Sequence, residues 1–291
     1  MKLRSVNSGK IVSFQRYDSW KEIIKEPEIQ PFKILLYNSR STGVYFYDKE
    51  ALLMEERIPR GILDSIGENT KEYSIIASVA RYYNFDDMTK KFIERHPKCN
   101  IINLGVGLDT FANRIERPDI TFFQIDFEET MNERKLWLKQ LPNEVLISGD
   151  IFKLKWTDEI SDKSLPTLML AAGVFQYFHE EEILTFLKSI KGKFPSGEII
   201  FDCTNTTGIK YAQKYVKKTG NTSAMMYFAV DNPKDIADKC EMELVDYRVF
   251  YTQARKQLKR RTGLYTRIAM RVCDNGHRAH IVHLKLNHHV H

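Results

Sequence analysis

The chain has 291 residues and a net charge of +6; 43% of its residues are hydrophobic and 28% are charged. This composition is typical of a globular protein and excludes disordered and collagen-like chains. No run of about 18 apolar residues predicts a membrane span, and the first ten residues lack the apolar core of a secretion signal. We therefore expect a cytoplasmic protein whose four widely spaced cysteines stay free and form no structural zinc site.

The N-terminal third of the sequence predicts helices, which we expect to form a cover over the rest of the domain. Pro31–Asn38 is apolar and predicts a helix, and 39–48 combines glycine with aromatic residues in a loop. This loop either covers a ligand or is a surface turn that buried tyrosines hold in place. Lys49–Arg57 predicts a further helix.

Two more helical patterns follow directly. Apolar residues recur at helical spacing in Thr70–Tyr83 and again in Phe85–His96, and Asp86 or Asp87 is a candidate cap for the second segment. Arg81 lies near the join, where it is either exposed or directed at a ligand.

The segment 100–126 carries the clearest pattern. The apolar strand Ile101–Leu104 leads into the turn Gly105-Val106-Gly107, a short helix ends near Arg114, and a second strand ends at Asp126. This order is how an open α/β sheet binds a nucleoside, because glycines let the backbone approach the ligand and the acid accepts hydrogen bonds from ribose. Asp126 follows Gly105 by 21 residues, as that site requires.

Two cofactors compete for this turn. The dinucleotide pattern G-x-G-x-x-G has Thr110 at its third glycine position, and Asp109 beside it would repel a pyrophosphate. The pattern therefore favours S-adenosylmethionine over NAD. A tight turn without a ligand is the remaining alternative.

The sequence after Asp126 predicts further strands of the sheet and another candidate acid. Glu128–Leu141 predicts a helix and Glu144–Ser148 a third strand, which stops before Asp150. Asp150 either accepts a hydrogen bond from an adenine amino group or caps the segment that follows. The continuous apolar run Leu165–Ala171 is typical of a central parallel strand.

The fourth strand opens into Ala172-Gly173 and continues to Tyr177, and His179 begins an acidic helix. A fifth strand, Glu198–Cys203, follows. Tyr177 and His179 are the candidate acid–base groups at this position, although His179 also fits a helix cap.

The last third breaks the alternation of strands and helices. Residues 204–238 predict a helical lid, and strands are expected at Met242–Tyr251 and His280–Leu286. Between these two strands lies a basic run that fits either a solvated helix face or a nucleic-acid contact. It consists of Arg255, Lys256, Lys259, Arg260, Arg261, Arg267 and Arg271. The terminal histidines are also candidates for a metal, but we assign no metal site.

These residues resemble the leucine carboxyl methyltransferase family. The stretch Leu104–Thr110 followed by Arg114 is similar to that family's L-G-x-G-x-D-T-x-x-x-R pattern. Over residues 30–287 the chain is most similar to the bacterial branch, the O-methyltransferases of polyketide biosynthesis of the tetracenomycin type. The resemblance implies a class I, Rossmann-like α/β fold with a seven-stranded sheet and S-adenosylmethionine as methyl donor.

The resemblance also implies roles for single residues. Arg81 would hold the carboxylate of the donor, with Arg40 as a second basic group near it. Asp126 would accept hydrogen bonds from the ribose hydroxyls. The other implied donor contacts are Gly105 and Gly107 of the turn, Asp150 and Ile151 at the adenine, and the position of Ala172.

One position departs from the family. Where the family has an acid in E-G-x-x-x-Y, this chain has Ala172, while Tyr177 is kept. A protein that binds the donor without catalysis is therefore the first alternative to an enzyme. A nucleic-acid-binding protein that uses the basic run 255–271 is the second.

The predicted organisation is one methyltransferase domain. Residues 1–97 form an N-terminal helical cover and 98–203 the donor-binding core. Residues 204–238 form the lid and 239–291 the closing strands. The predicted activity is S-adenosylmethionine-dependent O-methylation of a small-molecule hydroxyl or carboxylate.

Overall fold

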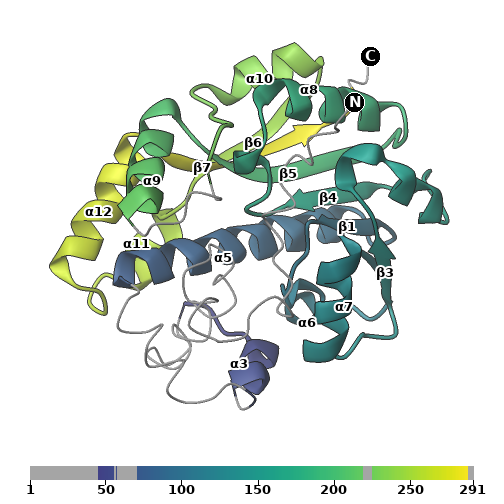
Figure 1. Cartoon of the computed structure of the whole chain (residues 1–291), viewed down its shortest axis with the longest axis horizontal. Coiled ribbons are helices and arrows are strands. Elements are labelled where there is room, and N and C mark those ends of the chain that lie inside the picture. The colour runs from purple at the N-terminus through teal and green to yellow at the C-terminus, as the bar shows by residue number, and fades with distance from the viewer. Residues whose placement is uncertain (1–44, 56, 58–70, 219–224, 288–291) are drawn as a thin grey trace.

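The computed structural model describes residues 45–55, 57, 71–218 and 225–287. Within these ranges the chain forms one 7-stranded sheet in the order β3-β2-β1-β4-β5-β7-β6 (Figure 1). The strands are β1 (Asn100–Leu104), β2 (Thr121–Asp126), β3 (Glu144–Ser148), β4 (Thr167–Ala171), β5 (Gly197–Thr204), β6 (Glu243–Val249) and β7 (Ala279–Lys285). The strands from β3 to β5 pair in parallel, and β7 is antiparallel to both β5 and β6. The predicted seven-stranded α/β fold is confirmed.

Helices cover both faces of this sheet. They are α3 (Lys49–Glu55), α5 (Glu72–Arg95), α6 (Phe111–Ile115), α7 (Glu128–Trp137), α8 (Glu180–Lys191), α9 (Thr206–Lys218), α10 (Pro233–Cys240), α11 (Thr252–Gln257) and α12 (Leu264–Asn275). One hydrophobic cluster joins the sheet to α5, α6, α11 and α12, and a second joins it to α8 and α10. The central strands β1 and β4 are buried along their whole length, which explains the apolar residues of β4 from Leu168 to Ala171, whereas β1 also buries Asn100 and Asn103.

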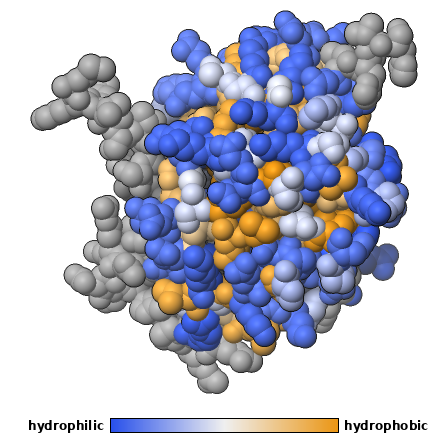
Figure 2. Space-filling view, turned by 90° about the vertical axis from the view of Figure 1, so that its right-hand side faces the viewer, coloured by the Kyte–Doolittle hydropathy of each residue, from blue (hydrophilic) through white to orange (hydrophobic). Residues whose placement is uncertain are grey.

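One side of the molecule presents both hydrophobic and hydrophilic residues. Figure 2 shows the side on which β3 forms the edge of the sheet, where hydrophobic areas are interrupted by hydrophilic residues. Such a surface is ordinary for a folded protein. Among the described residues, no helix is both long and apolar enough to cross a lipid bilayer.

One prediction for the N-terminal part, a helix cap at Asp86 or Asp87, is wrong. The two segments expected to join near residue 84 form a single helix, α5, which contains neither glycine nor proline. Neither predicted cap is a cap: Asp86 pairs with Arg114, and Asp87 pairs with Lys91 and Arg248. The partners on other elements neutralise two acids that would otherwise favour a helix start.

The range predicted as a lid contains two helices with different surroundings. α9 begins two residues after β5 ends, whereas α10 packs against α8 and β6. Asn232 caps α10 by accepting a hydrogen bond from the backbone N–H of Lys234, and Pro233 occupies the first turn. α10 is therefore part of the layer that covers the sheet. A lid role for the remainder stays a prediction.

Gly208 gives a test of how α9 is held. A Cβ at Gly208 would lie 2.3 Å from the carbonyl oxygen of Arg278, just before β7, whereas a Cβ at Gly192 at the end of α8 meets nothing within 4 Å. Alanine in a helix normally stabilises by about 1 kcal/mol relative to glycine. We expect the opposite for Gly208→Ala, a loss of about 1–3 kcal/mol, and a small gain for Gly192→Ala. Urea denaturation of both variants measures whether each substitution raises or lowers the free energy of unfolding. A stabilised Gly208→Ala would contradict the packing described.

Candidate functional site

The site begins at the glycine turn after β1. Gly105 and Gly107 have φ angles of 68° and 53°, a region that residues with a side chain rarely adopt. A Cβ at Gly105 would also lie 2.8 Å from a methyl group of Val174, which follows β4. The turn therefore needs glycine for its own conformation and for the close approach of the two loops.

Asp126 ends β2 beside this turn. Its two carboxylate oxygens accept hydrogen bonds from the backbone N–H groups of Gly107 and Phe127, both at 2.8 Å. Burial raises the pKa of Asp126 to about 6, although these hydrogen bonds and Arg134 act in the opposite direction. The free protein thus stabilises the ionised form of Asp126 less well than water does. Further hydrogen-bond donors to this carboxylate would therefore be favourable.

A second buried carboxylate lies at the end of β5. Asp202 accepts hydrogen bonds from Nε of Arg81 of α5 at 3.0 Å and from the backbone N–H of Gly173, and Nη2 of Arg81 lies 3.0 Å from the same carboxylate in an ion pair. Burial lowers the pKa of Arg81, but Asp202 together with Tyr82 and Tyr177 raises it overall. Arg81 is therefore not an exposed residue: it is held at the carboxyl end of β4 and β5.

Asp150 and Ile151 follow β3. The Asp150 carboxylate accepts a hydrogen bond from the backbone N–H of Phe152 at 2.9 Å and caps a 3₁₀ turn, Ile151–Lys153. The capping prediction for Asp150 is confirmed, and the second carboxylate oxygen takes no part in that hydrogen bond. Ile151 is buried. A contact of either residue with adenine stays a prediction.

The two candidate acid–base residues have different surroundings. Tyr177 ends the 3₁₀ turn Phe175–Tyr177 and is one of the groups that raise the pKa of Arg81, which places it near the buried ion pair. His179 precedes α8, where its backbone N–H donates to Glu182 at 2.8 Å and its ring packs on Tyr227. In the structure His179 is the N-cap residue of α8. A chemical role for Tyr177 or His179 stays a prediction.

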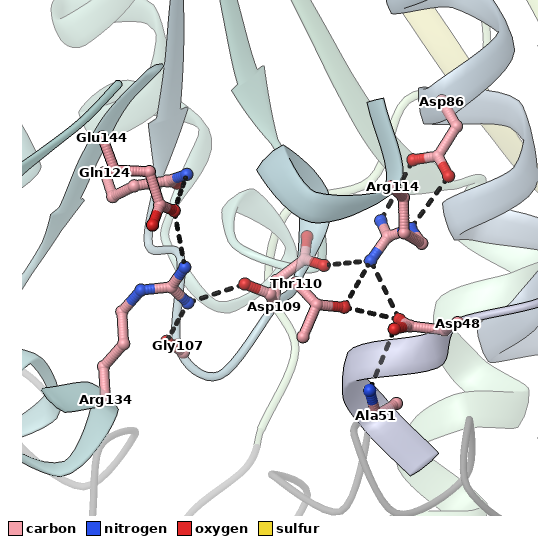
Figure 3. A network of polar contacts seen from close by, with 10 residues as sticks. All are labelled: Asp48, Ala51, Asp86, Gly107, Asp109, Thr110, Arg114, Gln124, Arg134 and Glu144. Carbon is pink, nitrogen blue, oxygen red and sulfur yellow. Dashed lines mark hydrogen bonds and ion pairs between the residues drawn. The ribbon is translucent and has the colours of Figure 1, made fainter. Parts of the chain in front are cut away.

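Arg114 is the centre of a buried network behind the turn (Figure 3). Its guanidinium pairs with Asp86 at 2.8 Å, with Asp109 at 2.8 Å and with Asp48 at 3.3 Å, and it donates to the Thr110 hydroxyl at 2.9 Å. Three carboxylates therefore share one guanidinium. Burial raises the pKa of Asp86, while Arg114 lowers it.

Arg134 of α7 holds the turn from its other side (Figure 3). It donates to the backbone carbonyl groups of Gly107 at 3.2 Å and Asp109 at 2.6 Å, and it pairs with Glu144 at 3.1 Å. Gln124 also donates to Glu144. The acid at position 109, predicted to repel phosphate, is thus paired inside the protein, and the conformation of the turn is fixed by two buried arginines.

The remaining sequence candidates lie away from this site or beyond the described ranges. Arg40 and the terminal histidines 288–291 are outside the described residues. The described residues contain no group of three or more potential metal ligands. The basic run is exposed except for Arg255, which is partly buried and pairs with Asp274 at 3.0 Å. This exposure fits the predicted solvated helix face. All four cysteines are free and buried, as expected.

The family follows from comparison with known proteins. The model of the leucine carboxyl methyltransferase family matches residues 36–191, more than half of the chain. The chain belongs to the leucine carboxyl methyltransferase family. It is 23% identical over 220 residues to the tetracenomycin polyketide synthesis O-methyltransferase TcmP of Streptomyces glaucescens, covering 69% of this chain and 80% of TcmP. The predicted resemblance and the predicted enzyme class, an S-adenosylmethionine-dependent methyltransferase, are confirmed.

Solved structures resemble the chain at low sequence identity. A DUF574 family protein from Streptomyces avermitilis has a TM-score of 0.55 at 10% identity, covering 87% of this chain and 96% of that one. Magnesium protoporphyrin IX methyltransferase from Synechocystis, solved with bound SAH, has a TM-score of 0.49 at 10% identity, covering 74% and 88%. The first of these supports the class I α/β architecture seen in the sheet order.

Sequence reasoning missed three acids of this region. Asp48 and Asp86 neutralise Arg114, and Asp202 binds Arg81, but none of them lies in a recognisable spacing with its partner. Only the motif itself contained a signal, because a buried Arg114 four residues after Thr110 requires acidic partners.

Proposed function

We propose that this chain methylates an oxygen atom, a hydroxyl or a carboxylate, of a small molecule. The observation that carries the donor half of the proposal is Asp126. Its charge is incompletely stabilised in the free protein, and it lies beside two glycines in the left-handed conformation. Two neighbouring ribose hydroxyls would donate to this carboxylate, while the turn leaves space for the rest of the nucleoside.

The other donor contacts follow the edge of the sheet. Arg81 would bind the donor carboxylate through its free edge, and the Asp150 carboxylate with the backbone of Ile151 would meet the adenine. Arg40 is a further candidate for the donor carboxylate. When bound, S-adenosylmethionine supplies a methyl group on a sulfonium, so the protein has only to bind, align and exclude water.

The acceptor determines whether a base is needed. As the acceptor oxygen forms its bond to the methyl carbon, the carbon–sulfur bond breaks and its electron pair stays on sulfur. A carboxylate acceptor is already ionised near neutral pH, whereas a phenol, with a pKa of about 10, must lose a proton. We propose Tyr177, near Arg81, as the first candidate for that proton and His179 as the second. The name of the relative TcmP, a polyketide synthesis O-methyltransferase, supports a small-molecule acceptor.

Calorimetric titration with S-adenosylhomocysteine tests the donor site. We expect the wild type to bind and Asp126→Asn to bind at least about tenfold more weakly, because charge-assisted hydrogen bonds to ribose are lost. Asp158→Asn, at an exposed acid, is the control with the same change of charge. Absence of binding to the wild type would refute the proposal.

A panel of phenols and carboxylates with labelled donor then tests methyl transfer. Turnover on an oxygen acceptor is the expected result. Binding of S-adenosylhomocysteine without turnover on any acceptor would favour the non-catalytic alternative, which the alanine at position 172 motivates.

A further inference from the structure

The carboxylate of Asp202 is the least explained group near the turn. Its residue is 2% exposed, and its two oxygens are turned towards the end of β4 and towards α5, where they meet Gly173 and Arg81. A buried ion pair is costly to desolvate, and a pair of apolar residues would join α5 to β5 at least as well. The ion pair therefore calls for a reason other than stability.

The position of the pair supplies that reason. A Cβ at Gly173 would lie 3.2 Å from Nη1 of Arg81, and Gly173 has a φ of 70°. The next residue, Val174, is the one that a side chain at Gly105 of the glycine turn would clash with. The guanidinium and the carboxylate therefore stand side by side at the edge of the sheet, next to the turn that binds the nucleoside in the proposed function.

The hydrogen-bonding capacity of the pair is not used up. Asp202 accepts hydrogen bonds from Nε of Arg81 and from the N–H of Gly173 and forms an ion pair with Nη2 of Arg81, so these donors do not fill the about four lone-pair positions of a carboxylate. A side chain at position 173 would meet Nη1 of Arg81, an atom that is not among those that contact Asp202. Beyond the contacts between the two residues, the pair therefore keeps an acceptor position on Asp202 and the donor N–H groups of Nη1.

We propose that Asp202 binds the ammonium group of the donor's amino-acid end and positions Arg81 for its carboxylate. An amino acid carries both charges on one carbon, and a neighbouring cation and anion match that pair of charges. This inference rests on the proposed function, since it assigns a residue to the same donor site.

The same placement accounts for Ala172. The parallel register pairs Ala171, the last residue of β4, with Phe201 of β5, so Ala172 in the turn after β4 and Asp202 of β5 each follow one member of that pair. The acid expected at position 172 is replaced by an acid on the neighbouring strand, and the negative charge stays at this edge of the sheet.

The test compares two ligands on two variants. S-adenosylhomocysteine carries the amino-acid end, and 5′-methylthioadenosine lacks it. We expect Asp202→Asn to weaken S-adenosylhomocysteine binding about tenfold or more, and to leave 5′-methylthioadenosine within about twofold. Asp238→Asn, at an exposed acid of α10, should bind both ligands as the wild type does. In Ala172→Glu/Asp202→Asn, which returns a carboxylate to β4, we expect part of the lost affinity to come back.

The other outcomes separate the two proposals. A wild type that binds neither ligand refutes the proposed function and this inference with it. A wild type that binds S-adenosylhomocysteine while Asp202→Asn binds it equally well, or loses both ligands to the same extent, refutes only the inference. If Asp202→Asn does not fold, the wild type is titrated with S-adenosylhomocysteine lacking its amino group. Affinity for this analogue within about twofold of the parent ligand overturns the assignment.

Discussion

Replacing Arg114 with methionine should destabilise the protein by about 3–5 kcal/mol, because it leaves three carboxylates without their shared cation. The side chain of Arg114 is 5% exposed, and those of Asp48 and Asp109 are 1% and 8% exposed. Water cannot take the place of the guanidinium at such depth. Urea denaturation at pH 7 measures the loss.

The loss of stability in Arg114→Met should depend on pH, and the direction of that dependence can be predicted. Burial raises the pKa of Asp86 and Arg114 opposes that rise, so without Arg114 the folded-state pKa of Asp86 should lie further above the unfolded value of about 3.9. An acid with a raised folded-state pKa loses stability as the pH rises, so the difference from wild type should shrink towards pH 4 and grow towards pH 7. Arg117→Met is the control, because Arg117 pairs with Asp119 at the surface and its loss should cost little. A deficit independent of pH, or one no larger than the control's, would contradict the network.

Donor affinity should fall about tenfold for each pH unit below 6, which is the second large effect. In the proposed function the ribose hydroxyls donate to the ionised form of Asp126, whose pKa in the free protein is about 6. Binding below that pH must first remove a proton, whereas above it the affinity should be constant. Calorimetry with S-adenosylhomocysteine between pH 5 and pH 8 follows this change, and buffers of different ionisation enthalpy count the released proton.

Asp126→Asn isolates the responsible group. The variant has no ionisable side chain at this position, so its weaker affinity should no longer change between pH 5 and pH 7. A wild-type affinity that is flat over this range would show that Asp126 is already ionised at pH 5. A variant that keeps the wild-type slope would assign the proton to another group.

The elements that could be predicted are those with local signals. The strand, glycine turn and closing acid of 100–126 lie within one short segment, and the structure places β1, the turn and Asp126 as expected. The central strand β4 was visible as an unbroken apolar run. In each case, the residues that form the element and the pattern that predicts it lie within one short segment of the chain.

The contacts that could not be predicted join distant segments. Arg81 and Asp202 are 121 positions apart, and Arg114 and Asp48 are 66 apart. Asp86 looked like a helix cap because its partner, Arg114, comes from another element. Pairings of this kind depend on which elements the sheet order brings together, and one sequence contains no periodicity that records them.

Asp48 gives the network a further consequence. One of its oxygens caps α3 through the backbone N–H of Ala51 at 3.0 Å, and the other binds the Thr110 hydroxyl, at the end of the glycine turn, and Arg114 (Figure 3). Displacement of α3 would therefore remove one of the contacts that hold the turn. If a ligand on the turn favours the conformation in which Asp48 binds Thr110, it also favours the docked α3, and by reciprocity any interaction that docks α3 raises the affinity for that ligand by the same factor. In the proposed function, α3 is thus coupled to the donor site through Asp48.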